Sequence, residues 1–278
     1  MAKQRIDAPN LVVVSDLHCG CRLGLCPKTG VPLEDGGTYM PSALQRKLWA
    51  MWRHFWDKWV PDVSRGEPIV VVVNGDAIDG EHHRSKTPFS HNIEDHRRCA
   101  RLLLAPIAKL CEGRFYMITG TAAHDGEAGQ EVESLARELG AIPDRTGRHC
   151  RYFLWKTVGR GLVHISHHIG TTRRAHYESS APHAELIAAF TEAGRWRRRP
   201  PDFVVRSHRH RHIQTEIPAD VGDAVSLVTA GWQLKTSFVL QKGMTVEPPQ
   251  IGGAIIRQGQ TYLYTRHRVW SIKDYEVE

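Results

Sequence analysis

The sequence contains five short clusters of histidine and aspartate, and most of them directly follow an apolar run. They are Asp16-Leu17-His18, Gly75-Asp76, Gly120-Thr121-Ala122-Ala123-His124, His167-His168 and Ser207-His208-Arg209-His210. Carboxylates and neutral imidazoles are ligands that suit Mn, Fe, Zn or Ni. Hydrolysis of a phosphate ester is slowed by charge repulsion. A metal pair neutralises the phosphate, lowers the pKa of a bound water and stabilises the leaving oxygen. The clusters supply ligands of the kind and number that a two-metal phosphoesterase site requires.

The order and spacing of these clusters resemble the calcineurin-like metallophosphoesterase superfamily. That family reads D-x-H, then G-D, then G-N-H-D/E, then a His after a strand, then G-H-x-H. The corresponding segments here are Asp16 to His18 after residues 11–15, Gly75-Asp76 after 69–74, His167 after 162–166, and His208 to His210 after 203–206. The resemblance runs from about residue 11 to residue 212. Each motif alone is weak, and the ordered set carries the signal.

The sequence departs from the family pattern in two places. Ser207 stands where the family has Gly before H-x-H, and the Asn-His pair of the third motif is absent. The segment from Gly120 to Asp125 keeps a Gly, a His and an acid, with the His displaced by two residues. The family's Asn supplies a neutral oxygen to the second metal. Three alternatives could fill the place of this Asn at the second metal: the side chain of Thr121, direct ligation by His124, or a water molecule.

The resemblance implies a role for each matching residue. Asp16, His18 and His210 would hold the first metal, Asp76 would bridge, and His167 and His208 would hold the second. A hydroxide between ions about 3.5–4 Å apart would attack phosphorus in line. His124 would act as general acid at the leaving oxygen or orient the phosphate. The implied cofactors are two divalent metal ions, with Mn preferred and Fe, Zn or Ni as alternatives.

Alternatives stay open at several positions. His168 competes with His167 as a ligand, and His164 is a weaker rival because strand alternation places it on the opposite face from Ile165. Asp79 and Asp125 would either orient ligating imidazoles or contact solvent. Taken singly, an Asp after a strand is often a helix cap, as at Asp16 or Asp76. The joint set favours a metal site.

Length and composition indicate an ordinary globular protein. The chain has 278 residues, 41% hydrophobic and 24% charged, and residues 1–278 are expected to form a single domain. No apolar stretch approaches the roughly 20 residues that span a bilayer, and no segment of signal-peptide length precedes the first strand, so a cytoplasmic location is expected. Cys19, Cys21 and Cys26 are crowded, but their spacing is not CxxC, and free thiols are favoured over a structural zinc.

The charge balance is basic, with a net charge of +7 and a pI near 9.2. Arginines gather around Trp196 in residues 195–199 and around the last His motif at Arg206, Arg209 and Arg211. Arginine beside a metal site suits a polyanionic substrate, and Trp196 could stack on a base. The alternative is a solvated basic face with a packed Trp196.

The pattern of elements predicts the fold class. Residues 19–41 are rich in Gly, Pro and Thr and predict a long loop. Ser42 and Gln45 predict a capping box that opens a helix to about Trp59, whose aromatic stripe indicates core packing, with self-association as the alternative. Strands and helices alternate in the first half, and the second half is strand-rich, with its last two strands expected at residues 254–256 and 261–267. This pattern favours an α/β protein with two mixed sheets flanked by helices, a four-layer α/β/β/α sandwich, which is also the fold that the resemblance implies.

These observations predict a metal-dependent phosphodiesterase, with a nuclease as one form of it. The alternatives are a phosphomonoesterase acting on protein, nucleotide or small molecules, and a non-catalytic metal-bound scaffold. The expected partner is a phosphate-ester substrate, with nucleic acid as a candidate and no membrane. Whether the chain works alone or as a homo-oligomer stays open.

Overall fold

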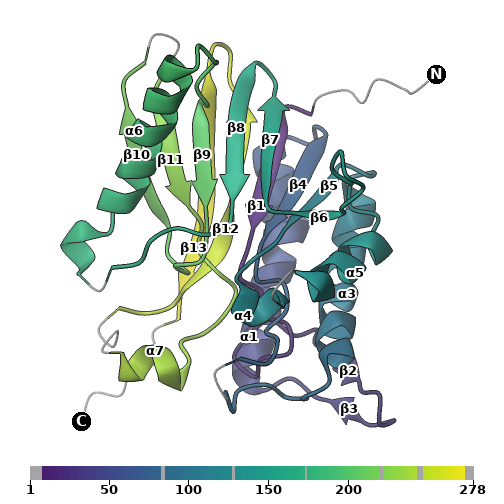
Figure 1. The fold of residues 1–278 in the computed structure, drawn as a ribbon. Helices are drawn as coiled ribbons and strands as arrows, with labels where there is room; N and C mark the ends of the chain where they lie inside the picture. The colour runs from purple at the N-terminus through teal and green to yellow at the C-terminus, as the bar shows by residue number, and fades with distance from the viewer. Residues whose placement is uncertain are drawn as a thin grey trace.

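The computed structural model describes residues 8–82, 85–126, 129–172, 174–219, 222–242 and 247–272, and two mixed β-sheets form its centre (Figure 1). The first sheet has the order β13-β12-β1-β4-β5-β6, and the second has the order β10-β11-β9-β8-β7. The strands of the first sheet are β1 (Asn10–Val14), β4 (Ile69–Asn74), β5 (Phe115–Ile118), β6 (Cys150–Arg151), β12 (Gln250–Gln258) and β13 (Leu263–Ser271). Those of the second are β7 (Phe153–Val158), β8 (Gly161–Ser166), β9 (Phe203–Arg206), β10 (Ile213–Ile217) and β11 (Ala224–Val228).

Helices lie on the outside of both sheets. The helical elements are α1 (Ala43–His54), η1 (Phe55–Trp59), α2 (Val60–Ser64), α3 (Ile93–Leu110), α4 (Ala122–Asp125), α5 (Gln130–Glu138), η2 (Ala175–Tyr177), α6 (Ser180–Arg195) and α7 (Ser237–Gln241). The first sheet is covered by α1, η1, α2, α3 and α5, whereas α6 lies on the second sheet (Figure 1). Among the described residues, no helix combines the length and the apolar character needed to cross a bilayer.

Three hydrophobic cores separate four layers. In β1, Val12 and Val14 face the helices, whereas Leu11 and Val13 face the second sheet. Val163 and Ile165 of β8 pack against that same inner space. A third, smaller core lies between the second sheet and α6. Strands buried on both faces explain the continuous apolar runs in the sequence. The predicted four-layer α/β/β/α sandwich is confirmed.

The strands that carry the predicted motifs run parallel within each sheet. In the first sheet β1, β4 and β5 are mutually parallel, and in the second β8, β9 and β11 are parallel. Antiparallel strands complete both sheets, with β12 and β13 in the first and β7 and β10 in the second. The residues that follow the parallel strands therefore meet at one end of the sandwich.

The helix predicted from Ser42 begins as expected and continues further. The Ser42 side chain accepts from the Gln45 backbone, and Gln45 returns a bond to Ser42, so the capping box is confirmed. The helix continues through the π-helical segment η1 and through α2. It ends at Ser64, where Arg65 adopts the left-handed conformation that is common at helix C-termini. The predicted end at Trp59 was therefore too early.

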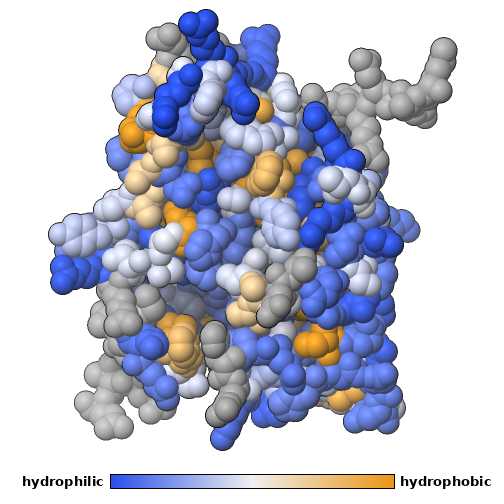
Figure 2. Space-filling view, viewed as in Figure 1, coloured by the Kyte–Doolittle hydropathy of each residue, from blue (hydrophilic) through white to orange (hydrophobic). Residues whose placement is uncertain are grey.

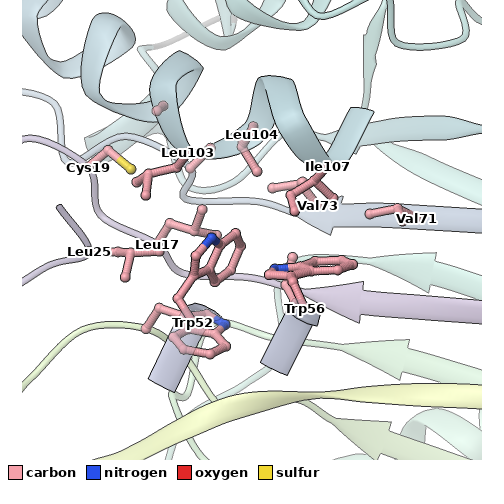
Figure 3. Close-up of a cluster of buried hydrophobic side chains, with 14 of the residues drawn as sticks. Leu17, Cys19, Leu25, Trp52, Trp56, Val71, Val73, Leu103, Leu104 and Ile107 are labelled. Carbon is pink, nitrogen blue, oxygen red and sulfur yellow. The ribbon is translucent and has the colours of Figure 1, made fainter. Parts of the chain in front are cut away.

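The aromatic stripe of this helix forms core. Leu48, Trp52, Phe55 and Trp56 are at most 3% exposed. Figure 3 shows Trp52 and Trp56 in one apolar cluster with side chains of α3 and β4. The packing explanation of the stripe is confirmed.

Two regions differ in extent from the prediction. The expected loop of residues 19–41 contains a short hairpin formed by β2 (Val31–Pro32) and β3 (Thr38–Tyr39). The strands expected at residues 254–256 and 261–267 are the nine-residue strands β12 and β13. The predicted strand began too late because glycine usually weakens a strand, and Gly252 lies near the start of β12. Here it is required, because a Cβ atom at Gly252 would lie 1.8 Å from the Arg268 carbonyl oxygen.

Candidate metal centre

The predicted ligands converge at the C-terminal ends of four parallel strands. Asp16 and His18 follow β1, Asp76 follows β4, His167 follows β8, and the last His motif follows β9. Asp16, His18, Asp76 and His167 are at most 2% exposed, although all are polar. Buried charged groups need a partner or a metal ion. Three groups of side chains that could hold a metal ion lie here: Asp16-His18-His210, Asp76-His167-His208 and His18-Asp79-His124.

The first group joins both sheets. The Nε2 atoms of His18 and His210 lie 3.2 Å apart, and His210 Nε2 lies 3.2 Å from Asp16 Oδ1. His18 Nδ1 donates to Asp79 Oδ1 at 3.0 Å, which leaves the Nε2 lone pair pointing at His210. Asp79 therefore orients an imidazole, one of the two roles considered for it. The third group, His18-Asp79-His124, follows from this hydrogen bond. Asp79 bonds to His18 Nδ1, so His18 Nε2 stays available to the first group.

The second group is organised in the same manner. His167 Nδ1 donates to the Asn74 carbonyl oxygen at 2.7 Å, so its Nε2 lone pair points at Asp76 Oδ2, 3.1 Å away. His208 belongs to this group and lies with its ring 5.4 Å from that of His167. His167 Nε2 also lies 4.0 Å from Asp16 Oδ1. The two groups are therefore neighbours, because His167 Nε2 lies within 4.0 Å of carboxylate oxygens of both Asp16 and Asp76.

The backbone at the ligands is held in the left-handed region. Asp16, His18, Asp76, His208 and His210 have φ angles of 54°, 45°, 48°, 70° and 52°. Non-glycine residues rarely adopt such angles, and each costs about 1–3 kcal/mol. Five of the six predicted ligands share this conformation. The fold therefore imposes their side-chain directions at an energetic cost, a pattern that is typical of functional sites.

A chain of buried hydrogen bonds lies beneath the ligands. The Asn74 amide donates to Ser207 Oγ at 2.7 Å, Ser207 Oγ lies 2.7 Å from Thr229 Oγ1, and Thr229 Oγ1 lies 2.7 Å from Ser15 Oγ. Ser15 and Ser207 directly precede Asp16 and His208 in the sequence. Ser207, a departure from the family pattern, thus provides one of the hydrogen bonds that join the two sheets. This chain of contacts was not predicted, and its only signal in the sequence is a polar residue at the end of each apolar strand.

The region of the absent Asn-His pair is occupied differently. The backbone N–H and the hydroxyl of Thr121 both donate to Asp76 Oδ1, at 2.8 and 3.2 Å. Thr121 therefore anchors the carboxylate. His124 Nδ1 donates to the Asp79 carbonyl at 2.5 Å, and its ring lies edge-on against His18 at 4.5 Å. Asp125 is buried and accepts from the Gly120 N–H.

Charge coupling shifts the pKa values of the ligands. Burial alone would raise the pKa of Asp16, but the charge of His210 outweighs it and lowers that pKa to about 2. Burial opposes the charged form of Asp76 as well, yet His167 holds its pKa well below the usual range. In turn, burial would lower the pKa of His167, but the charge of Asp76 raises it to about 10. Burial and the charge of His167 lower the pKa of His208 to about 4.

The donor set fits divalent cations. Asp16 Oδ1 and His167 Nε2 are buried and have no hydrogen-bond partner. In both groups the unprotonated face of an imidazole points at another acceptor, an arrangement that needs either a proton or a cation between the two atoms. The raised pKa of His167 shows the same demand, with a proton in the place of the cation. Within the described residues, the groups able to hold a cation consist of His and Asp and contain none of the six cysteines, all of which are buried.

Other predicted candidates lie elsewhere. His168 is exposed, with its ring 4.8 Å from that of His208, so it borders the second group. His164 faces the outside of the second sheet and contacts Arg206. Arg195 to Arg199 precede β9, whereas His208 follows it, so this arginine cluster lies at the opposite end of the sheet from the ligands. Arg209 donates to the carbonyls of Gly170 and Glu178 and fixes that loop.

The chain is similar to known proteins in structure but not in sequence. No family model and no curated protein matches the sequence. Vps29 from Entamoeba histolytica, solved with Zn²⁺, is 9% identical with a TM-score of 0.38, over 94% of this chain and 98% of that one. The Thermus thermophilus sulfate thiohydrolase SoxB is 11% identical with a TM-score of 0.43, over 98% of this chain and 58% of that one. A Candida albicans 5'-nucleotidase is 12% identical with a TM-score of 0.36, over 89% and 46%. At these values the similarities transfer no residue's role to this chain.

Proposed function

We propose that this chain is a metal-dependent phosphodiesterase that uses two divalent metal ions, as the resemblance to calcineurin-like metallophosphoesterases implies. The observation that carries the proposal is the pairing of two carboxylate-imidazole groups separated by only 4.0 Å, between His167 Nε2 and Asp16 Oδ1. Asp16, His18 and His210 would hold one ion, and His167 and His208 the other, with Asp76 shared between the ions as the resemblance implies. When bound, such ions would neutralise the phosphate and lower the pKa of a water molecule.

The residues of the chain have distinct tasks in this proposal. Asp79 and the Asn74 carbonyl fix the rings of His18 and His167, so that the same nitrogen of each faces inward. Thr121 holds one oxygen of Asp76, which directs the other oxygen toward His167. Mn is the preferred metal, and Fe, Zn or Ni would also suit these ligands.

His124 is the candidate for proton transfer to the leaving oxygen. Its Nδ1 proton is engaged by Asp79, so Nε2 is the atom that would face the substrate. Burial and the charge of His18 lower the pKa of His124 to about 4 in the free protein. A bound phosphate brings negative charge, which favours the protonated imidazole and raises that pKa. His124 would therefore take up its proton as the substrate binds.

The basic balance supports a polyanionic diester over a small monoester, since the net charge of +7 attracts phosphates that flank the scissile one. The test compares hydrolysis of bis-p-nitrophenyl phosphate with that of p-nitrophenyl phosphate, with Mn²⁺ added, with and without chelator. Preference for the diester that is lost with chelator is expected. Preference for the monoester would replace this proposal with a phosphatase, and no turnover despite bound metal would favour a scaffold. An Asp76→Asn variant should lose turnover while it keeps its fold.

A further inference from the structure

The outer face of β7 and β8 is a surface that the metal centre does not use. The helix α6 covers the outer side of β9, β10 and β11, and Figure 1 shows no helix in front of β7 and β8. On β7, Leu154 and Val158 point into the core, whereas Phe153 and Trp155 point outward and are 57% and 48% exposed. Large aromatic side chains exposed side by side on a strand commonly mark a binding surface.

This face begins at the metal centre. Phe153 pairs in register with Ser166, the residue before His167, and Trp155 pairs with His164. The strands then run away from the ligands for six residues, about 20 Å at the usual rise of a strand. They end at the Gly159-Arg160 turn, where Arg199 donates to the Arg160 carbonyl at 2.8 Å. The arginine cluster of residues 195–199 therefore lies at the far end of the same face.

Trp155 is fixed in place although it is half exposed. Its ring lies 4.4 Å from that of His164, and Arg206 Nη1 lies 3.3 Å from His164 Nδ1. Arg206 is 6% exposed and is held by Glu185 of α6 at 2.7 Å. This chain of contacts from α6 to Trp155 holds the indole as a preformed platform.

We propose that a single-stranded nucleic acid binds along this face, with bases stacked on Trp155 and Phe153 and its backbone passing from the arginine cluster to the metal centre. This inference rests on the proposed function and names the substrate class of the same site. Proteins that bind single strands combine aromatic side chains, on which bases stack, with positive charges along the path of the backbone, because every base has a face that can stack and every phosphate a charge. Figure 2 shows strongly hydrophilic residues gathered above α6 and paler and orange residues over the middle of β7 and β8. Arg197 and Arg198 are exposed in that cluster.

The test measures fluorescence anisotropy of fluorescein-labelled dT12 and U12 on the full chain carrying Asp76→Asn, so that the strand stays intact. Replacing Trp155 by Ala should raise Kd roughly 5- to 100-fold, the loss expected for one stacked base, and Trp155→Phe should restore most of the affinity. Leu110→Ala is the control, since Leu110 is 51% exposed but lies at the end of α3, which covers the first sheet. It should leave Kd unchanged.

Salt dependence tests the far end of the face. The double variant Arg197→Gln/Arg198→Gln should reduce the slope of log Kd against log salt by up to about 1.4, at about 0.7 per phosphate contact on a single strand. A three-nucleotide probe bound at the metal centre cannot reach both ends, so its slope should not change. The control is Lys109→Gln, which removes a positive charge from the outer side of α3. It should leave the salt slopes of both probes unchanged.

The outcomes separate this inference from the proposed function. Equal Kd for the parent and Trp155→Ala, with unchanged melting temperature, would overturn the inference. So would a dimer that dissociates on Trp155→Ala, because the face would then bind a second copy. If the wild-type chain hydrolyses bis-p-nitrophenyl phosphate while Trp155→Ala leaves the Kd for dT12 unchanged, the inference alone fails. If it hydrolyses neither test ester while Trp155→Ala weakens dT12 binding, the nucleic-acid face stands and the proposed catalysis fails.

Discussion

The side-chain amide of Asn74 donates a 2.7 Å hydrogen bond to the hydroxyl of Ser207, and this bond joins the two sheets directly beneath the candidate metal centre. Asn74 precedes Asp76 by two residues, and Ser207 precedes His208 by one. The same Asn74 gives its carbonyl oxygen to His167. The position of each ligand group is therefore coupled to the packing of the sheets.

Replacing Ser207 by Ala should destabilise the fold. The change leaves the hydroxyl of Thr229 and the amide of Asn74 each without one buried partner, at a cost of about 1–3 kcal/mol. Urea denaturation measures the free energy of unfolding. Thr191→Ala, which removes an exposed hydroxyl bonded to the Ile187 carbonyl, is the control and should change it little. An equal effect from both substitutions would contradict the coupling.

Asp79→Asn should weaken metal binding without removing a ligand. The carboxylate of Asp79 accepts from His18 Nδ1 and so fixes the tautomer that exposes Nε2. Loss of such a partner typically lowers metal affinity roughly 10- to 100-fold. Calorimetric titration with Mn²⁺ measures the effect. If the variant binds as tightly as the wild type, His18 is oriented by something other than Asp79.

His124→Asn should affect substrates according to their leaving group. A general acid matters little when the leaving group is a stable phenolate, and it typically contributes 10²- to 10⁴-fold when the leaving group is a poor one such as an alkoxide. The ratio of kcat/KM for bis-p-nitrophenyl phosphate to that for a dinucleotide should therefore rise strongly in the variant. A uniform loss on both substrates would assign His124 to phosphate orientation instead.

The binding of metal should release protons near neutral pH. The charge of Asp76 overcomes burial and raises the pKa of His167 from 6.5 to about 10, so the metal-free imidazole is protonated at pH 7 and must lose its proton to bind a cation. Mn²⁺ affinity should rise with pH up to about 10. For the metal-free chain the sign is opposite, because a raised pKa contributes stability that is present below pH 6.5 and is lost as pH rises toward 10.

Calorimetry in buffers of different ionisation enthalpy measures this proton release. His167→Asn should release fewer protons than the wild type at pH 7, whereas His168→Asn should release the same number, because His168 is exposed outside the group. Affinity for Mn²⁺ that is independent of pH between 6 and 9 would contradict the raised pKa of His167.

The sequence predicts the sheets and the ligand clusters because both have strong local signals. Apolar runs of five or six residues that are rich in Val and Ile are typical of buried strands, and an acid or imidazole after each run is conspicuous. The grouping of Asp16, His18 and His210 followed from the family pattern, and the structure brings these residues together. By contrast, the hydrogen bonds of Asn74 with Ser207 and of Ser15 with Thr229 join residues 133 and 214 positions apart. The contacts of His164 with Trp155 and Arg206 cross from one strand to the next. Such contacts depend on register and sheet packing, which no local pattern encodes.

The positions of the arginines illustrate the same limit. Residues 195–199 and Arg209 stand on either side of β9 in the sequence, only a few residues from the His motif. The strand Phe203–Arg206 places the two sets at opposite ends of the sheet. Proximity in sequence to a ligand therefore did not indicate proximity to the metal centre.

The most direct test of the two-metal centre is the number of Mn²⁺ ions bound per chain, measured by mass spectrometry of the dialysed protein after loading. Two ions are expected for the wild type, and one for each of His18→Asn and His167→Asn, since these residues belong to different groups. One ion in the wild type, or two in both variants, would contradict the assignment of the two groups to two metal ions.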